Sequence, residues 1–347
     1  MLLKTLVSNY LKRMSMATFI LALGFMWLQN PAAAQTKEFE IRDNRPFLGG
    51  QQIEIWGIRT GSAMTSEAIT QRLIDRLDDF LAHGINAFLV NVQGGNGGWP
   101  DGGAALNGFD PDGTLKEVVK QRMKRLILAA DQRGMVVCVE IFSHRHDQEL
   151  EGDHAVEKAV KEVASFLKNE KLRNVFVDLC HEFNIRAMEQ ALLKEPNGPE
   201  KKKQLQDWFH SIAPDIECGV CPAFQSDTAI EYPGADILIV QKEHPLPQKG
   251  LVINIETQRQ DQYNNEGVFT DEGRKKILQY CQTYHAAPNA FLFFHSAWVH
   301  GISGKTGTAP HYEPGGGGTG PEDRGIRFLF DWIRTNVGRY EYPRHIK

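Results

Sequence analysis

The chain has 347 residues and a net charge of −4 with histidine neutral, and its pI is about 6.3. This near balance of charge gives no case for nucleic acid or an anionic membrane surface as the main partner. The length is sufficient for one large domain or two small ones.

The first 34 residues are typical of an export signal. Lys4, Lys12 and Arg13 precede a short apolar segment, 17–28, and three alanines at 32–34 offer a cleavage site. A membrane anchor is the alternative, but the apolar segment is shorter than the ~20 residues that a spanning helix needs. We therefore predict a signal peptide at 1–34 and a secreted or periplasmic mature chain at 35–347, with no stable membrane insertion after cleavage.

After this signal, the chain alternates predicted strands and helices. A small hairpin at 39–48 comes first, turning at Asp43-Asn44. Apolar runs typical of buried strands follow at 53–58, 85–92, 135–142, 174–184, 218–223, 237–241, 251–255 and 290–294. Helical patterns lie between most of them: at 65–83, from a capping box at Thr114-x-x-Glu117 to just before Gly134, from 153 onwards, and at 199–212, 270–285 and 324–337. This order predicts one α/β domain, a (β/α)8 TIM barrel with a small N-terminal hairpin.

A doubly wound open sheet is the alternative fold. A dinucleotide-binding sheet of that kind would carry G-x-G-x-x-G directly after its first strand. Here the first strand is followed by Arg59-Thr60-Gly61-Ser62, which does not fit.

The five cysteines are Cys138, Cys180, Cys218, Cys221 and Cys281. Cys138 and Cys180 lie within apolar strand patterns, which favours buried and unreactive thiols. Cys218 and Cys221 are spaced as a disulfide or as half of a metal site. No second pair of this spacing completes a zinc site, so we favour a structural role and expect no metal and no cofactor.

In a parallel barrel, the carboxyl ends of all strands meet at one face. The predicted strands therefore bring six residues around one cleft: Arg59, Asn91, His144, Glu182, Glu256 and Trp298. Glu182 and Glu256 follow strands four and seven and face each other across it. Such a pair of carboxylates suits glycoside cleavage, with one protonating the leaving oxygen and the other attacking the anomeric carbon.

Other polar residues have plainer interpretations. Glu140 lies inside a strand and is interpreted as a buried structural acid, whereas Glu243 rivals Glu256 if the strand count is off by one. The basic run Lys201–Lys203 is interpreted as a solvated helix face. Trp99, in the glycine-rich loop 94–113, either stacks on sugars or pins that loop.

The sequence around these carboxylates resembles the clan of retaining glycoside hydrolases that carry the acid/base on strand four and the nucleophile on strand seven. The family of cellulases and mannanases, family 5, is its best-known member. The resemblance is sharpest at Val177-Asp178-Leu179-Cys180-His181-Glu182-Phe183, and it continues at Ile253-Asn254-Ile255-Glu256. It begins at the hairpin 42–47 and at Trp56-Gly57-Ile58-Arg59, so it covers nearly the whole mature chain.

This resemblance implies roles for individual residues. Glu182 would be the acid/base and Glu256 the nucleophile, with Arg59 orienting the nucleophile. Trp298 matches the aromatic residue that floors the subsite of the cleaved sugar, and His144 resembles the histidine that follows strand three. His181 stands where the family has asparagine and Phe183 where it has proline.

The predicted partner is therefore an oligosaccharide or polysaccharide, cleaved at a β-linked O-glycosidic bond by a retaining mechanism that needs no cofactor. Two alternatives stay open. One is a barrel that binds a glycan without cleaving it. The other is a phosphate-binding barrel enzyme, because the glycine run 315–320 precedes the last helix. Pro321-Glu322-Asp323 brings negative charge to that helix end, which disfavours phosphate.

Overall fold

The computed structural model describes residues 35–94, 107–143, 146–183, 189–194, 198–223, 234–241, 246, 249–256, 269–300, 314 and 326–343. Residues Thr36–Lys347 form one compact unit. Several sequence predictions fall outside the described residues: the export signal at 1–34, Trp99, His144, Glu243 and the glycine run at 315–320. Among the residues that are described, no helix is long and apolar enough to cross a bilayer.

Eight parallel strands form the centre of the unit, confirming the predicted (β/α)8 barrel. In chain order they are β4 (Trp56–Arg59), β5 (Ala87–Asn91), β6 (Val136–Ser143), β7 (Val175–His181), β8 (Cys218–Gly219), β9 (Leu238–Val240), β10 (Val252–Asn254) and β11 (Ala290–Phe294). Their order in the sheet is β8-β7-β6-β5-β4-β11-β10-β9. Each strand is buried on both faces, which is why the runs read as continuously apolar rather than alternating.

The two edge strands, β8 and β9, lie beside each other and nearly close the barrel. A Cβ atom at Gly219 would lie 2.5 Å from the carbonyl oxygen of Ile237, so the backbones approach too closely there for any other residue. Further along, Gln241 Nε2 donates a hydrogen bond of 2.7 Å to the carbonyl oxygen of Pro222. No backbone pairing between β8 and β9 occurs among the described residues, so the closure rests on this close approach and on side-chain contacts.

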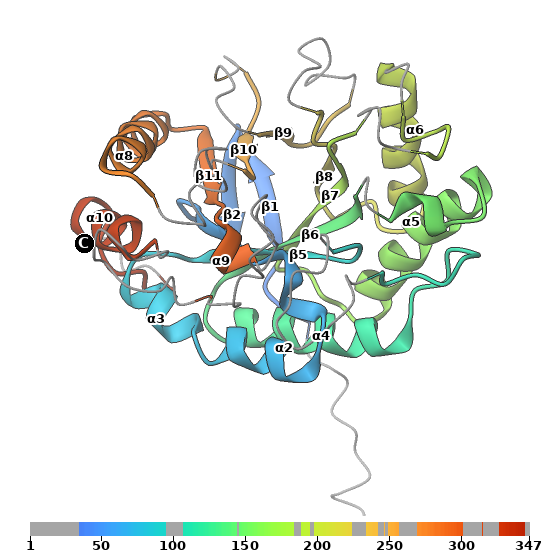
Figure 1. Cartoon of the computed structure of the whole chain (residues 1–347), viewed down its shortest axis with the longest axis horizontal. Coiled ribbons are helices and arrows are strands. Elements are labelled where there is room, and N and C mark those ends of the chain that lie inside the picture. Colours follow the sequence, from blue (N-terminus) through green and yellow to red (C-terminus); the bar gives the residue numbers. More distant parts are fainter. Residues whose placement is uncertain are drawn as a thin grey trace, which may run out of the picture. The chain divides into compact units, whose positions relative to one another are not determined.

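Helices form a ring outside the strands (Figure 1). They are α2 (Glu67–Ile74), α3 (Leu77–Ala82), α4 (Glu117–Asp131), α5 (Asp153–Asn169), α6 (Pro199–His210), α8 (Asp271–Ala286) and α10 (Arg327–Asn336). The short helix α9 (Ala297–His300) contacts β4 and the 3-10 turn η1 (Gly61–Met64) instead, and a second 3-10 turn is η2 (Asp147–Glu149). The predicted helix 65–83 is two helices, α2 and α3, separated at Asp75-Arg76. Ser66 caps α2 and Thr270 caps α8, in each case by accepting a hydrogen bond from a backbone N–H.

The basic run on α6 is only partly a solvated face, so that interpretation was wrong for its middle residue. Lys202 is fully buried, with its ammonium 5.8 Å from the ring centre of Phe183. Burial lowers the pKa of Lys202 to about 8. Helical periodicity explains the difference, because Lys201 and Lys203 point away from the direction that Lys202 shares with the buried Leu205.

The N-terminal hairpin closes the opposite end of the barrel from the strand carboxyl ends. Strands β1 (Phe39–Arg42), β2 (Arg45–Leu48) and β3 (Gln51–Gln52) form an antiparallel sheet. Phe39 packs on Phe176, near the start of β7, with ring centres 5.6 Å apart, and Phe176 in turn meets Phe293 at 5.8 Å. These aromatic side chains fill the barrel interior next to the hairpin, and polar groups lie at the other end.

Candidate active site

A cluster of buried ionisable side chains lies at the carboxyl ends of the strands. Arg59 ends β4, Glu140 lies in β6, His181 ends β7 and Glu256 follows β10. Each of the four is less than a tenth exposed. Four strands that are distant in sequence thus deliver charged groups to one point, as the strand-end rule predicted for Arg59 and Glu256.

Arg59 binds two carboxylates at once. Its Nη2 donates to Glu140 Oε2 at 2.7 Å, and its Nη1 donates to Glu256 Oε2 at 3.3 Å. Asn91 holds the other oxygen of Glu140 through its side-chain amide. The planar guanidinium therefore fixes the position of Glu256 relative to the barrel wall.

His181 completes the contacts of Glu256. Its Nε2 lies 3.2 Å from Glu256 Oε2, and its Nδ1 lies 3.4 Å from Arg59 Nη1. Burial and the neighbouring Arg59 lower the pKa of His181, which favours the neutral ring. A neutral ring protonated on Nε2 donates to Glu256 and accepts from Arg59, which satisfies both contacts.

The two buried carboxylates differ in their proton affinity. Burial raises the pKa of Glu140 well above its ordinary value, against the opposing charge of Arg59. Burial acts on Glu256 in the same sense, but the hydrogen bond from His181 and the electrostatic interactions with His295 and Arg59 hold its pKa well below the usual range. Glu256 therefore loses its proton more readily than Glu140 and is ionised at neutral pH.

Glu182 directly follows His181 where β7 ends, and it is half-buried. Its charge partly offsets the lowering of the His181 pKa and adds to the raising of the Glu140 pKa, so its carboxylate lies near the cluster. Its backbone φ of +55° is in the left-handed region, which non-glycine residues rarely adopt. Backbone hydrogen bonds of 2.9 and 3.1 Å between Phe183 and the segment after β8 hold this turn in place.

Two histidines of the cluster were missed from the sequence as site residues. His295 directly follows β11, and His300 ends α9; both are buried, with ring centres 4.7 Å apart. His300 Nδ1 accepts a hydrogen bond of 3.2 Å from the backbone N–H of Gly61. The strand-end rule would have found His295, because that residue follows its strand as directly as Glu182 follows β7.

Trp298, the predicted floor of a sugar subsite, lies in α9, and its side chain is outside the part that the structure describes. The interpretation of Glu140 as a buried acid is confirmed by its full burial, and its ion pair with Arg59 adds it to the site. All five cysteines are free and buried, so the disulfide alternative for Cys218 and Cys221 was wrong.

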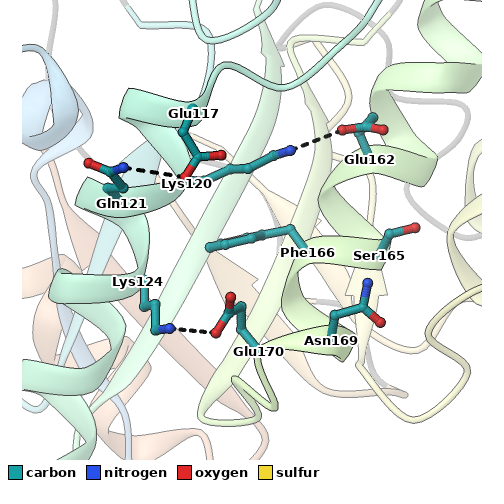
Figure 2. A pocket seen from close by; sticks show the side chains of 9 residues that line it. All are labelled: Glu117, Lys120, Gln121, Lys124, Glu162, Ser165, Phe166, Asn169 and Glu170. Carbon is teal, nitrogen blue, oxygen red and sulfur yellow. Dashed lines mark hydrogen bonds and ion pairs between the residues drawn. The ribbon is translucent and has the colours of Figure 1, made fainter. Parts of the chain in front are cut away.

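A separate groove of about 430 Å³ lies between α4 and α5 on the outside of the barrel (Figure 2). Two ion pairs cross it, Lys120 to Glu162 at 3.4 Å and Lys124 to Glu170 at 2.5 Å, and Phe166 lies between them. Four of the charges that line it are thus paired, Glu117 accepts a hydrogen bond from the amide of Gln121, and none of these groups belongs to the strand-end cluster. The strand-end cluster, rather than this groove, is therefore the candidate active site.

Comparisons with known proteins give a likeness of fold. No protein-family model matches the sequence, and no curated protein matches it. Among solved structures, the chain is similar to a family 5 glycoside hydrolase from Bacteroides vulgatus (14% identity, TM-score 0.51, covering 75% of this chain and 64% of that one). It is also similar to an exo-β-1,4-mannosidase from an Opitutaceae bacterium (13%, 0.53, 86% and 63%).

A third similar structure is a family 5 mannosidase from Rhizomucor miehei, determined in complex with mannosyl-fructose (11%, 0.57, 86% and 97%). The chain spans less than two thirds of the length of the first two proteins but nearly all of the third. The predicted resemblance to family 5 is therefore confirmed in three dimensions, and the chain has the barrel fold of these glycoside hydrolases.

Proposed function

We propose that the protein is a glycoside hydrolase that cleaves a β-linked glycan by a retaining mechanism, with Glu182 as acid/base and Glu256 as nucleophile. The proposal rests on the position and the ionisation of the Glu256 carboxylate. This carboxylate stands at a strand end of a barrel similar to those of family 5, and it is kept ionised by Arg59 and His181.

An ionised, positioned carboxylate suits nucleophilic attack on an anomeric carbon. The attack forms a bond between a Glu256 oxygen and the sugar while the glycosidic bond breaks, and a proton from Glu182 goes to the departing oxygen. Water, deprotonated by Glu182, then releases the sugar. The positive groups around Glu256 hold it ready for attack, and they also stabilise it again as leaving group in the second step.

The backbone at Glu182 supports its part in the proposal. A non-glycine residue with φ of +55° is strained, and such strain persists where surrounding contacts fix it, often at functional sites. Here the bridge between Phe183 and Pro222 fixes the turn just after Glu182. The turn directs the side chain from the strand end, next to the charge cluster, while leaving it half-exposed to substrate.

The proposed class of substrate is based on the proteins with similar structures. One of them is named as an exo-β-1,4-mannosidase, and another was determined with mannosyl-fructose bound. We propose an oligosaccharide or polysaccharide with β-linked sugars as the substrate of this chain. His181, in place of the family's asparagine, uses its Nε2 on Glu256.

Two amide variants test the assignment of roles. Glu256→Gln should abolish turnover of every substrate, because the nucleophile is lost. Glu182→Gln should lose turnover on natural glycans by about 10²–10⁴-fold, yet keep most of the first step on aryl glycosides whose leaving group needs little protonation. Equal losses of turnover from both variants on aryl glycosides would contradict the roles. If wild type binds glycans without turnover and both variants keep the same affinity, the protein is a non-catalytic glycan-binding barrel instead.

We also propose export from the cytoplasm, on the basis of the basic, apolar and small-residue order in 1–34. N-terminal sequencing of protein recovered from outside the cytoplasm should begin at Gln35. A mature protein that still carries Met1 would contradict the proposal.

A further inference from the structure

A second cluster of metal-binding side chains lies on the outer side of the barrel wall, away from the strand-end site. It comprises His210 at the end of α6, Cys218 at the start of β8 and Asp236 just before β9. One candidate ligand atom from each residue lies within 4.8 Å of the others. Cys218 is buried, and the other two are partly exposed, so the cluster is open to small ions on one side.

Three electron-pair donors converge on one imidazole nitrogen. His210 Nε2 lies 3.1 Å from Asp236 Oδ2, 3.3 Å from the carbonyl oxygen of Ile216 and 3.5 Å from Cys218 Sγ. The nitrogen carries at most one proton, so it satisfies at most one of these acceptors well. A metal ion in place of that proton would bind nitrogen, oxygen and sulfur together.

The distances match tetrahedral zinc. With Zn–S of about 2.3 Å and Zn–N and Zn–O of about 2.0–2.1 Å, ligand atoms at tetrahedral angles lie roughly 3.3–3.6 Å apart. The observed separations from His210 Nε2, 3.1 Å to oxygen and 3.5 Å to sulfur, require little movement. Imidazole, thiolate and carboxylate form a ligand set that suits zinc better than magnesium or calcium.

The carboxylate is already oriented by neighbours, as expected of a ligand. Gln206 Nε2 donates to Asp236 Oδ1 at 3.2 Å and to the carbonyl oxygen of Gly234 at 2.5 Å. The backbone N–H of Cys218 donates to Asp236 Oδ2 at 2.9 Å. Outer contacts of this kind fix ligands before a metal arrives and strengthen its binding.

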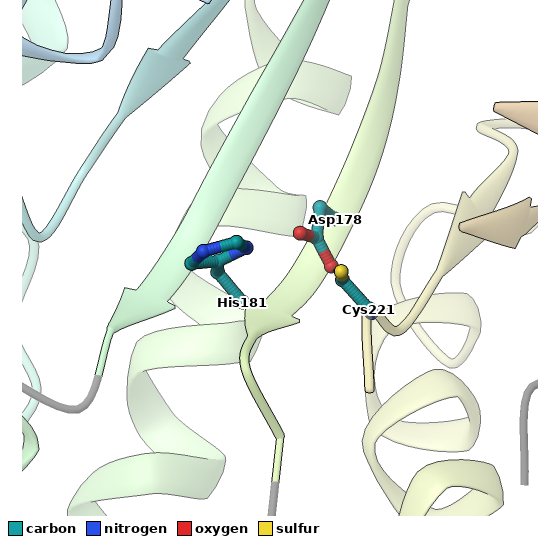
Figure 3. Close-up of side chains that lie close together, drawn as sticks. All are labelled: Asp178, His181 and Cys221. Carbon is teal, nitrogen blue, oxygen red and sulfur yellow. The ribbon is translucent and has the colours of Figure 1, made fainter. Parts of the chain in front are cut away.

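The inner cluster of Asp178, His181 and Cys221 is a poorer candidate, although its ligand atoms also lie within 4.8 Å of one another. Figure 3 shows the Asp178 carboxylate facing the Cys221 sulfur, with the His181 ring set apart. The positive charge of Arg59 acts on all three groups and would repel a cation. By contrast, the charged groups whose fields act on Cys218 are the carboxylates of Asp236 and Glu217.

We propose that His210 Nε2, Cys218 Sγ and Asp236 Oδ2 bind one Zn²⁺ ion, which ties α6 to the closing strands β8 and β9. The fourth position is left to water or to the carbonyl oxygen of Ile216. Binding displaces the proton of the Cys218 thiol, which leaves as H⁺ while the thiolate bonds to zinc, and the proton on His210 Nε2 is lost as H⁺ from the charged ring or moves to Nδ1 in the neutral ring. Cys221 takes no part, because it faces the barrel interior, whereas Cys218 faces α6.

Cobalt substitution of the full chain tests this proposal. Metal-free protein, prepared with a chelator, is titrated with Co²⁺, and the thiolate-to-cobalt charge-transfer band is followed. One equivalent should produce the band in wild type, in Cys221→Ser and in Cys281→Ser, which serves as a buried-cysteine control. The band should be absent from Cys218→Ser. Zn²⁺ should displace the cobalt and raise the melting temperature of wild type but not of Asp236→Asn.

Folding of the variants is checked by circular dichroism, and Asp236→Asn and His210→Gln give independent readings if Cys218→Ser does not fold. These two variants should weaken Co²⁺ binding at least tenfold. Failure of wild type to form the band, or a band that survives in Cys218→Ser or is lost in Cys221→Ser, would overturn the proposal.

Discussion

Arg59 shows how one residue sets the charge of the site. The guanidinium is buried, and it contacts Glu140 and Glu256, which together carry more negative charge than it can balance. The imbalance is resolved by proton affinity, since burial raises the pKa of Glu140 while Glu256 remains ionised. One cation thus contacts two carboxyl groups of unequal proton affinity, a division that suits acid–base chemistry.

Arg59→Lys should lower kcat/KM by at least about tenfold, because a single ammonium cannot hold both carboxylates as the planar fork does. The acidic limb of the pH–rate profile should also move to higher pH, because Glu256 loses part of the field that lowers its pKa. Arg133→Lys is the control, since Arg133 pairs with Asp78 at the surface. An Arg59→Lys profile that coincides with wild type would show that Arg59 does not act on Glu256.

At the scale of an element, Asp178 joins β7 to the segment that follows β8. Its Oδ1 accepts backbone hydrogen bonds from Cys221 at 3.0 Å and Cys180 at 3.3 Å. Burial raises the pKa of Asp178 to about 7, although these hydrogen bonds and Arg59 oppose the shift. The short strand β8 is therefore held partly by a carboxyl group that keeps its proton to near neutral pH.

The stability of the fold should depend on pH through Asp178. Between about pH 4 and pH 7 the unfolded chain has lost this proton while the folded chain retains it, so the group's contribution falls as pH rises, and it is constant above that window. Asp178→Asn keeps the acceptor without the titration. The free energy of unfolding of the variant should therefore rise relative to that of wild type by up to about 4 kcal/mol across this window. This figure corresponds to about three pKa units at about 1.4 kcal/mol each.

Urea unfolding at several pH values measures this difference. A free-energy difference between Asp178→Asn and wild type that stays constant from pH 4 to pH 8 would contradict the assignment of the raised pKa to Asp178.

The sequence predicted elements best where apolar runs were long. The predicted strand 290–294 coincides with β11, and the predicted bounds of β5, β6 and β7 differ from the observed ones by at most three residues. β8 and β9 are shorter than predicted, because the closure between them rests on Gly219 and on side chains such as Gln241. Periodicity carries no signal for such tertiary contacts.

The site was predicted in outline for a physical reason. Carboxyl ends of parallel strands converge, so Arg59 and Glu256 could be placed together without coordinates. The burial of Lys202 and the pairing of Glu140 with Arg59 could not, since both depend on which neighbours fill the space beside a residue. His295 could have been predicted as a site residue, because it follows a strand directly, as Glu182 does. The sequence analysis did not select it.

In the whole molecule, the N-terminal hairpin and the ionisable cluster lie at opposite ends of the barrel. The hairpin β1–β2 covers the amino ends of the strands through Phe39, while the ionisable cluster occupies the carboxyl ends. Tyr342 near the C-terminus also reaches the hairpin, donating a hydrogen bond of 2.8 Å to the carbonyl oxygen of Leu48. A substitution at the hairpin end should therefore lower the stability of the fold without changing the geometry of the ionisable cluster.

Phe39→Ala should lower the free energy of unfolding by about 3–5 kcal/mol, because it leaves a cavity beside Phe176. The kcat of the molecules that remain folded should be unchanged. Denaturant unfolding and initial rates at low temperature measure the two quantities separately. A loss of kcat without loss of stability would mean that the hairpin acts on the site rather than on the fold.

The most direct test of the proposed function is to trap a sugar on the enzyme. The protein is incubated with a panel of 2-deoxy-2-fluoro β-glycosides, its intact mass is measured, and the labelled peptide is sequenced. The account predicts one sugar per chain, attached to Glu256, and no label in Glu256→Gln. A sugar attached to another carboxylate, such as Glu243 or Glu182, would contradict the assignment of Glu256 as the nucleophile.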